Sequence, residues 1–121
     1  GKEQVRVGEV MALHEAVLHH RLITAVNIPL NVRVAVQYVA RTEGDEPIIF
    51  SALAKWPSGR TRLVLGGTGR VPVLALDGPE AGGLDVAARN AYSQAGDEWA
   101  SAEYRQEMAG LLAVRCLGQL S

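Results

Sequence analysis

Hydrophobic and polar side chains alternate most regularly in residues 31–41, NVRVAVQYVAR. Every second position is apolar, and a period of two is typical of a β-strand with one half-buried face. The apolar positions are Val32, Val34, Val36 and Tyr38. We therefore expect a strand here, with these four side chains on the same face of a sheet.

Three more apolar segments predict further strands. They lie within residues 47–57 (PIIFSALAKWP), 60–67 (RTRLVLGG) and 71–76 (VPVLAL). The polar sequence TEGDEP separates the first strand from the second. Pro57, Ser58 and Gly59 form a tight-turn sequence between the second and the third, so these two strands are expected to form a hairpin.

After a glycine-rich connection at residues 77–83, the sequence changes to a helical pattern. Residues 84–95 are rich in alanine and contain no proline, and Gly96 follows as a candidate C-cap. Strands followed by helices predict an α+β fold. In this fold the helices pack on one face of an antiparallel sheet of three to four strands.

Residues 101–117 contain the clearest helical pattern of the chain. Ser101 can cap the helix, and Glu103 lies in the first turn, where the helix dipole favours a negative charge. Apolar side chains recur at the spacing of one helical face. They are Tyr104, Met108, Leu111 and Leu112.

The first thirty residues have the character of a tail from a larger unit. A charged start and a short amphipathic stretch precede LITAVNIP, which predicts a strand that ends at Pro29. The chain begins with Gly1 rather than Met, so we expect a fragment whose start has been trimmed. Residues 31–121 then form one domain.

Composition narrows the range of partners. Hydrophobic residues make up 48% of the 121 residues and aromatic residues only 5%, so the core must be aliphatic. The net charge of −1 gives no reason to expect nucleic acid as a partner. No apolar run is long enough to cross a membrane, and no signal peptide is evident. A single cysteine fits a reducing compartment, and we expect a cytoplasmic protein.

Histidines are the first candidates for chemistry. His14, His19 and His20 cluster near the start of the chain. Metal ligands must converge on one point, whereas adjacent histidines on a strand face opposite ways and a spacing of five does not share a helical face. We therefore interpret them as surface histidines of a connecting region.

The glycine-rich sequence LGGTGR, residues 65–70, is the second candidate. Glycines allow backbone N–H groups to approach a phosphate, but phosphate loops open a helix and this segment leads into another strand. A turn between strands is the favoured interpretation.

The other reactive side chains also favour structural interpretations. Glu43, Asp45 and Glu46 lie in a polar turn, where carboxylates are solvated. Cys116 follows late in a helix and is expected to be a buried structural thiol. Three arginines, Arg60, Arg62 and Arg70, lack the interleaved aromatic residues of a nucleic-acid surface. We predict no catalytic residue and no metal ligand, because no nucleophile, base and orienting group occur together.

Four segments resemble, in order and spacing, the FAD-binding subunit of the molybdenum hydroxylases, the family of aerobic carbon monoxide dehydrogenase and xanthine dehydrogenase. RLITAVNIP (21–29) resembles the end of the family's second flavin-binding subdomain, and YVARTEGDEP (38–47) resembles the strand and turn that open its C-terminal domain. LVLGGTGRVP (63–72) and ASAEYRQEM (100–108) resemble later parts of that domain. The likeness therefore extends over nearly the whole chain.

The resemblance implies a role in electron transfer. In that family the subunit holds FAD and passes electrons from iron–sulfur clusters to an acceptor, while the molybdenum chemistry occurs on another subunit. Residues 1–30 would close a flavin-binding subdomain, or link to it, and residues 31–121 would form the domain that packs over the flavin. The expected partners are the FAD-binding domains of the same subunit and the molybdopterin and iron–sulfur subunits.

The resemblance also implies which residues lie near the flavin: Val36, Tyr38, Arg41 and Asp45. Some relatives place an aromatic residue near the position of Val36, where this chain has an aliphatic one, and Tyr38 follows on the same strand face. The alternative is a non-catalytic module that has kept this fold and acts by forming a homodimer or docking onto a partner.

Overall fold

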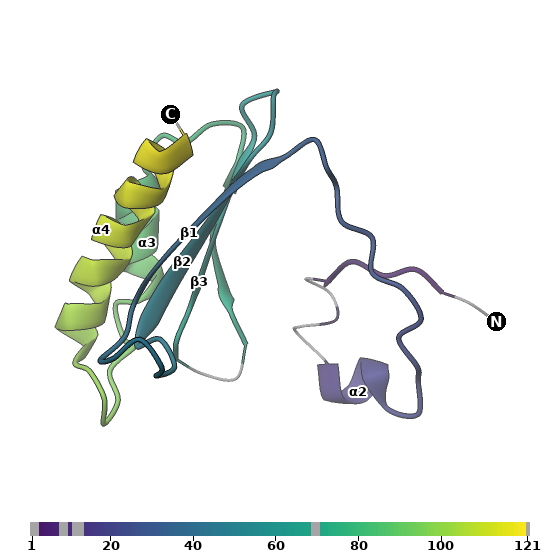
Figure 1. Cartoon of the computed structure of the whole chain (residues 1–121), viewed down its shortest axis with the longest axis horizontal. Helices are drawn as coiled ribbons and strands as arrows, with labels where there is room; N and C mark the ends of the chain where they lie inside the picture. Colours follow the sequence, from purple (N-terminus) through teal and green to yellow (C-terminus); the bar gives the residue numbers. More distant parts are fainter. Residues whose placement is uncertain (1–2, 8–9, 11–13, 69–70, 121) are drawn as a thin grey trace. The chain divides into compact units, whose positions relative to one another are not determined.

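A computed structural model describes residues 3–7, 10, 14–68 and 71–120. The chain divides into two compact units, Gly1–Leu30 and Asn31–Ser121 (Figure 1). The strands described below all belong to the second unit.

The first unit includes a short helix, α2 (His14–Leu18). The strand expected at residues 22–29 is not formed, because this segment is irregular throughout. A strand is stabilised by pairing with a neighbour, and this segment pairs with none in the described part of the chain. Its apolar side chains are consequently exposed: Leu22, Ile23, Val26, Ile28 and Leu30, the last at 94%.

The second unit contains a four-stranded antiparallel sheet in the order β1-β2-β3-β4. The strands are β1 (Arg33–Val39), β2 (Ile49–Lys55), β3 (Thr61–Gly66) and β4 (Val73–Gly78). All four match segments predicted from the sequence. Each strand pairs with the next one along the chain, so hairpin connections are sufficient.

The turn between β2 and β3 forms as its sequence predicts. Gly59 adopts a left-handed conformation, with φ of 94°, and its N–H donates to the carbonyl of Trp56. Trp56 in turn donates its N–H to the carbonyl of Arg60, which closes the hairpin. A positive φ is readily available only to glycine, so the turn depends on this residue.

Two helices follow the sheet, α3 (Leu84–Ala91) and α4 (Ala102–Leu120). Figure 1 shows both on the same side of the sheet, α4 against β1 and β2 and α3 against β4. The predicted α+β fold, with helices on one face of an antiparallel sheet, is confirmed.

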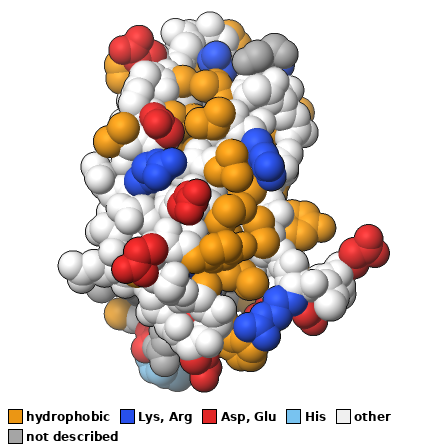
Figure 2. Space-filling view, turned by 90° about the vertical axis from the view of Figure 1, so that its left-hand side faces the viewer, with side chains coloured by type: hydrophobic (Ala, Val, Ile, Leu, Met, Phe, Trp, Pro, Cys, Tyr) orange, Lys and Arg blue, Asp and Glu red, His pale blue; other side chains and the backbone are white. Residues whose placement is uncertain are grey.

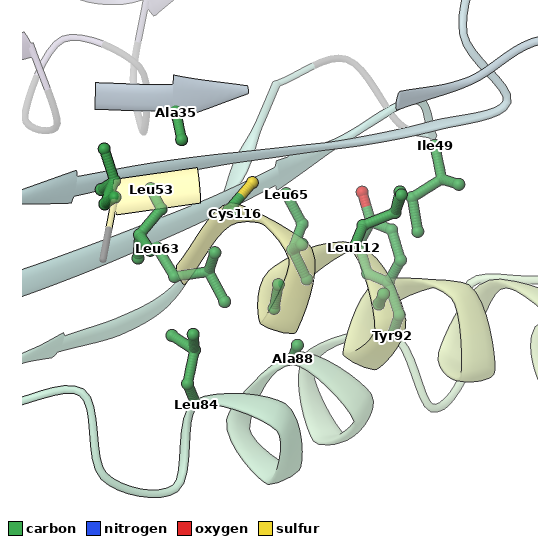
Figure 3. Packing of buried hydrophobic residues seen from close by; sticks show 13 residues of the cluster. Ala35, Ile49, Leu53, Leu63, Leu65, Leu84, Ala88, Tyr92, Leu112 and Cys116 are labelled. Carbon is green, nitrogen blue, oxygen red and sulfur yellow. The ribbon is translucent and has the colours of Figure 1, made fainter. Parts of the chain in front are cut away.

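The core between sheet and helices is almost entirely aliphatic (Figure 3). Alternate residues of β2 and β3 point into it, as do Ala35 of β1 and the small residues of α4. Cys116 is fully buried, and its Sγ lies 3.4 Å from the carbonyl oxygen of Ser51. Burial raises the pKa of the Cys116 thiol, so Cys116 is the buried structural thiol that the sequence predicts.

The face of α4 that meets the sheet differs from the predicted apolar face. Leu112 is buried, but Tyr104 and Leu111 are each 40% exposed and Met108 is half-buried. The buried face is instead lined by small residues and one arginine: Arg105, Ala109, Gly110, Ala113 and Cys116, with Leu112 and Leu120. Small side chains let the helix lie close to the strands. Tyr104, Leu111 and Val114 face outward.

The end of α3 also differs from the prediction. The helix ends at Ala91 with Tyr92 as its C-cap, and Gly96 does not adopt the left-handed C-cap conformation. The N–H groups of Tyr92, Ser93 and Ala95 each donate to a carbonyl three residues back, which tightens the chain beyond the helix. This turn accompanies the burial of the Tyr92 ring in the core.

One buried charge anchors the loop between α3 and α4. Arg105 is 1% exposed, and its Nη1 donates to the carbonyl of Ala95 at 2.9 Å and to Oδ2 of Asp97 at 2.6 Å. The other carboxylate oxygen of Asp97 accepts the N–H groups of Trp99 and Ala100. Arg105 therefore joins the first turn of α4 to the loop that precedes it.

The start of α4 is capped as predicted. Ser101 Oγ accepts the N–H of Tyr104 at 3.1 Å, and Glu103 lies in the first turn. The segment ASAEYR thus combines a helix cap, a favourable charge at the helix start and the arginine that holds the loop.

Replacing Arg105 with alanine should lower the free energy of unfolding by about 2–4 kcal/mol, because it leaves a cavity and a carbonyl without its donor. Urea unfolding followed by circular dichroism measures this change. Glu98→Ala, in the same loop, is the matched control and should change stability by less than about 0.5 kcal/mol. Equal stabilities for the two variants would contradict the anchoring role.

The Asp97 carboxylate should make this anchor sensitive to acid. The hydrogen bond from Arg105, with smaller contributions from the N–H groups of Trp99 and Ala100, lowers the pKa of Asp97. The stabilisation is therefore complete above the unfolded-state pKa, about 3.9, and is lost as pH falls through the lower folded-state value. The stability difference between wild type and Asp97→Asn should be largest near neutral pH and shrink toward about pH 3, as measured by urea unfolding at each pH. If the stability difference between wild type and Asp97→Asn does not change with pH, the ionised Asp97 carboxylate is not the source of the stabilisation.

Candidate functional site

The sheet has one face that the helices leave uncovered. Burial alternates along β1, β2 and β3, and the strand register extends the outward-facing side to β4. The outward-facing residues include an apolar set: Val34, Val36, Tyr38, Phe50, Ala52, Val64 and Leu74. We call this set the open face. Val34, Val36, Tyr38 and Leu74 are each more than half exposed. The alternation in β1 is as predicted, but the smaller residue Ala35 faces the core and the larger apolar side chains face outward.

Tyr38 lies beside the only phenylalanine of the chain. In the strand register Tyr38 is opposite Phe50, and Phe50 is opposite Gly66. A Cβ on Gly66 would lie 2.1 Å from the ring of Phe50, so the ring lies directly over the glycine backbone. The open face therefore carries two neighbouring aromatic side chains at the end of β1.

Val36 begins the adjacent row of the open face. It is 52% exposed and lies opposite Ala52, which pairs with Val64, which pairs with Leu74. Together the two rows form an apolar surface without a charged side chain. Such a surface suits a flat aromatic ring or the apolar face of another domain.

The hairpin end of the same face is charged. Arg60 and Arg62 both form ion pairs with Asp77, at 3.2 and 3.1 Å, and both guanidinium groups lie over the ring of Trp56, at 5.3 and 5.6 Å. The hydrogen bond from Arg60, followed by that from Arg62, lowers the pKa of Asp77 against an opposing effect of desolvation. The sequence pattern indicates Arg60 and Arg62 as a candidate basic face but does not indicate that Asp77 pairs with them. The register of β3 and β4, which places Asp77 opposite Arg62, is the feature that identifies this partner.

Arg41 and Asp45 lie in the exposed segment after β1 rather than on the open face. The Arg41 guanidinium lies 5.2 Å from the centre of the Trp99 ring, in the loop before α4. Asp45 donates its N–H to the carbonyl of Thr42. The described contacts of these two residues are therefore away from Tyr38.

The remaining candidates are the glycine-rich segment and the histidines. Gly67 has φ of 106° and lies against the carbonyl of Ile48, so the described part of LGGTGR turns the chain after β3. Residues 69–70 lie outside the described residues. The rings of His19 and His20 lie 3.9 Å apart, and among the described residues no group of three His, Cys, Asp or Glu side chains could hold a metal ion.

Surface depressions are shallow in the described part of the molecule. Two of them, of about 480 and 470 Å³, lie beside Arg60 and Asp77 and between Val73 and Tyr92. Both are open to solvent and neither contains Tyr38. The candidate site is therefore a surface and not a cleft.

No helix in the described residues is long and apolar enough to cross a membrane. No protein-family model and no curated protein matches the chain. Among solved structures, the chain resembles carbon monoxide dehydrogenase from Oligotropha carboxidovorans, with 24% identity and a TM-score of 0.60 over 75% of this chain and 37% of that chain.

A second similar structure is quinoline 2-oxidoreductase from Pseudomonas putida 86, with 19% identity and a TM-score of 0.53 over 78% of this chain and 38% of that one. Carbon monoxide dehydrogenase from Hydrogenophaga pseudoflava is similar over 75% of this chain and 37% of the other, with 20% identity and a TM-score of 0.51. At these identities the likeness shows the fold alone. The matched part of this chain spans little more than a third of those chains.

Gly66→Ala should displace the Phe50 ring from the open face and cost about 1–3 kcal/mol of stability, because the new methyl group occupies the position of the ring. Phe50 fluorescence is weak, so the measurement is urea unfolding together with the methyl and ring NMR shifts of β2. Gly44→Ala is the matched control, since nothing lies within 4 Å of a Cβ there. In a background of Phe50→Ala the cost of Gly66→Ala should fall; an unchanged cost would show that the backbone and not the ring is responsible.

Proposed function

We propose that this chain is the C-terminal part of an FAD-containing electron-transfer subunit of a molybdenum hydroxylase, and that the open face of its sheet packs over the flavin. Its fold is that of chains in carbon monoxide dehydrogenases and quinoline 2-oxidoreductase. The sequence resemblance of residues 21–29 and 100–108 to the family's FAD subunit supports the same assignment.

The observation that carries the proposal is the exposed apolar surface around Tyr38. Tyr38 is 58% exposed although it sits in a regular strand, and Val36 and Phe50 extend its apolar surface. An isoalloxazine ring is flat and aromatic, so it is suited to stacking on such a surface. Covering the ring from this side would exclude water and fix its orientation.

The residues present fit the ring of FAD but not its pyrophosphate. Backbone N–H groups of a glycine-rich loop at the start of a helix bind pyrophosphate, whereas Gly66 and Gly67 end a strand and turn the chain toward β4. The pyrophosphate would therefore be held by domains that precede this one. When bound, FAD would accept electrons and pass them on, and this chain would supply packing rather than reactive groups.

Arg41 and Asp45 would act at the polar edge of the flavin under this proposal. Both are exposed in the segment that follows β1, only a few residues from Tyr38. A guanidinium group donates hydrogen bonds to carbonyl oxygens, which is the chemistry of the pyrimidine edge of the ring. Arg41 would have to leave or share its position over Trp99 to do so.

The first unit fits the end of a preceding flavin-binding subdomain. Five large apolar side chains between residues 22 and 30 are more than half exposed in an irregular segment. Burying them against a larger domain would be favourable. The molybdopterin and iron–sulfur subunits would be further partners, and the cytoplasm the expected compartment.

The reading frame upstream of Gly1 tests the proposal first: it should encode two glycine-rich FAD loops. In the protein that includes them, Tyr38→Ala should alter the flavin absorption spectrum and raise the dissociation constant for FAD by about tenfold, the loss of one stacking contact. Tyr104→Ala is the matched control, because Tyr104 is an exposed tyrosine of the helix layer.

Two results would contradict this assignment. One is tight, stoichiometric binding of FAD by the present chain alone, which would mean that the phosphate-binding groups are within it. The other is an identical flavin spectrum and affinity in the Tyr38 variant, which would remove the open face from the cofactor site. A natural start near Gly1 would favour the non-catalytic alternative.

A further inference from the structure

The helix layer has an apolar outward surface of its own. Figure 2 looks onto this layer and shows a band of hydrophobic side chains with Lys or Arg side chains on both sides. One ridge of α4 carries exposed apolar side chains, and we call it the α4 outer face. Its residues are Tyr104, Glu107, Leu111, Val114, Arg115 and Gly118, with Met108 at its edge, where the half-buried side chain also packs against the core.

The composition of this face is unusual for a helix that already buries its opposite side. The outward side of such a helix normally carries mostly charged and polar residues. Here Tyr104 and Leu111 are 40% exposed and Val114 is 51% exposed. Glu107 and Arg115 are exposed, and neither forms an ion pair among the described residues.

The α4 outer face is symmetric about Leu111 in its chemistry. Four residues before Leu111 is Glu107, and four residues after it is Arg115. Three residues before it is Met108, and three residues after it is Val114. Each acidic, basic or apolar residue thus has a complementary residue at the same distance on the other side of Leu111.

The ends of the face are also complementary. Seven residues before Leu111 is Tyr104, a large ring, and seven after it is Gly118, where a Cβ would have nothing within 4 Å. These three positions are one heptad apart, the spacing at which helices pack along a shared seam. A ring from a second molecule could therefore lie over Gly118.

We propose that the α4 outer face is a homodimer interface, in which two copies of α4 pack antiparallel about a two-fold axis at Leu111. A two-fold contact pairs residue i with j and j with i. This arrangement places Leu111 against Leu111 of the second copy. It also places Glu107 of each copy beside Arg115 of the other, and Tyr104 of each copy over Gly118 of the other. The self-matching pattern favours a second copy of this chain over an unrelated partner.

The expected dimer is weak and reversible. The face runs from residue 104 to residue 118, which spans only about 21 Å of helix. An interface of this length is at the small end for a specific protein contact. The dimer should therefore appear as the protein is concentrated, and it does not depend on the flavin or on the open face.

Charge reversal of the present chain tests the antiparallel register. Glu107→Arg alone and Arg115→Glu alone each replace two attractive contacts with two repulsive ones, so each should raise the dimer dissociation constant by about tenfold or more. The two substitutions together restore the attraction and should return the dissociation constant to near the wild-type value. Sedimentation velocity over a range of protein concentrations measures all four proteins.

Mixing the two single variants gives a sharper result. The chain with Glu107→Arg and the chain with Arg115→Glu each repel their own copies, but every charge contact between them is attractive. The equimolar mixture should therefore form a heterodimer at concentrations at which each variant alone is a monomer. Circular dichroism checks that both variants are folded.

Val36→Ser, on the open face, is the control and should dimerise as the wild type does. A wild-type chain that remains a monomer at every concentration would overturn the proposal. So would a dimer that survives both charge reversals, a mixture that fails to associate, or a dimer that is lost on Val36→Ser and retained with Glu107→Arg.

Discussion

The close packing of α4 on the sheet is the contact on which the rest of this domain depends. Ala109, Ala113 and Cys116 bring the helix against β1 and β2, and each is fully buried. Because these side chains are small, the interior is filled by Leu53, Leu63 and Leu65 from the sheet. Three large apolar residues of α4, Tyr104, Leu111 and Val114, remain on its outer side.

In this packing, one face of the sheet is buried against one face of the helix layer, and the other face of each layer is left uncovered. A sheet has two faces, and the two helices of this domain both lie on the same one. The apolar residues of the other face, led by Val36 and Tyr38, are left uncovered, as are Leu111 and Val114 on the helices. Exposed apolar surface is disfavoured unless something covers it. Both uncovered faces therefore support the two binding surfaces proposed above.

Local structure was largely predictable from the sequence. All four strands follow from runs of apolar or alternating residues, and Ser101 caps α4 as its position suggests. The strand expected at residues 22–29 fails because alternation shows only that a segment could pair, while pairing requires a partner. The helix expected to reach residue 95 ends early because the chain turns where the Tyr92 ring enters the core.

The orientation of each element was harder to predict. Alternation in β1 separates two faces but does not say which one meets the helices, and the smaller Ala35 takes the inner position. For α4, the largest apolar residues define a stripe that suggests the wrong inner face. The Arg105–Asp97 pair was missed because an arginine inside a helix carries no local sign of burial. Phe50 was also missed as a neighbour of Tyr38. The pairing of β1 with β2 places the two residues opposite each other, so the strand register alone would have identified it.

The two uncovered faces lie on opposite sides of the domain, and this determines how they can be used. The open face belongs to the sheet and the α4 outer face to the helix layer, with the buried core between them. A ligand on one face would not obstruct the other, so the proposed flavin covering and the proposed dimerisation are compatible in the same molecule. Each binding event that requires the folded domain also stabilises it by mass action. This domain is held together by one contact between a helix layer and a sheet. Binding at either face would therefore raise its free energy of unfolding.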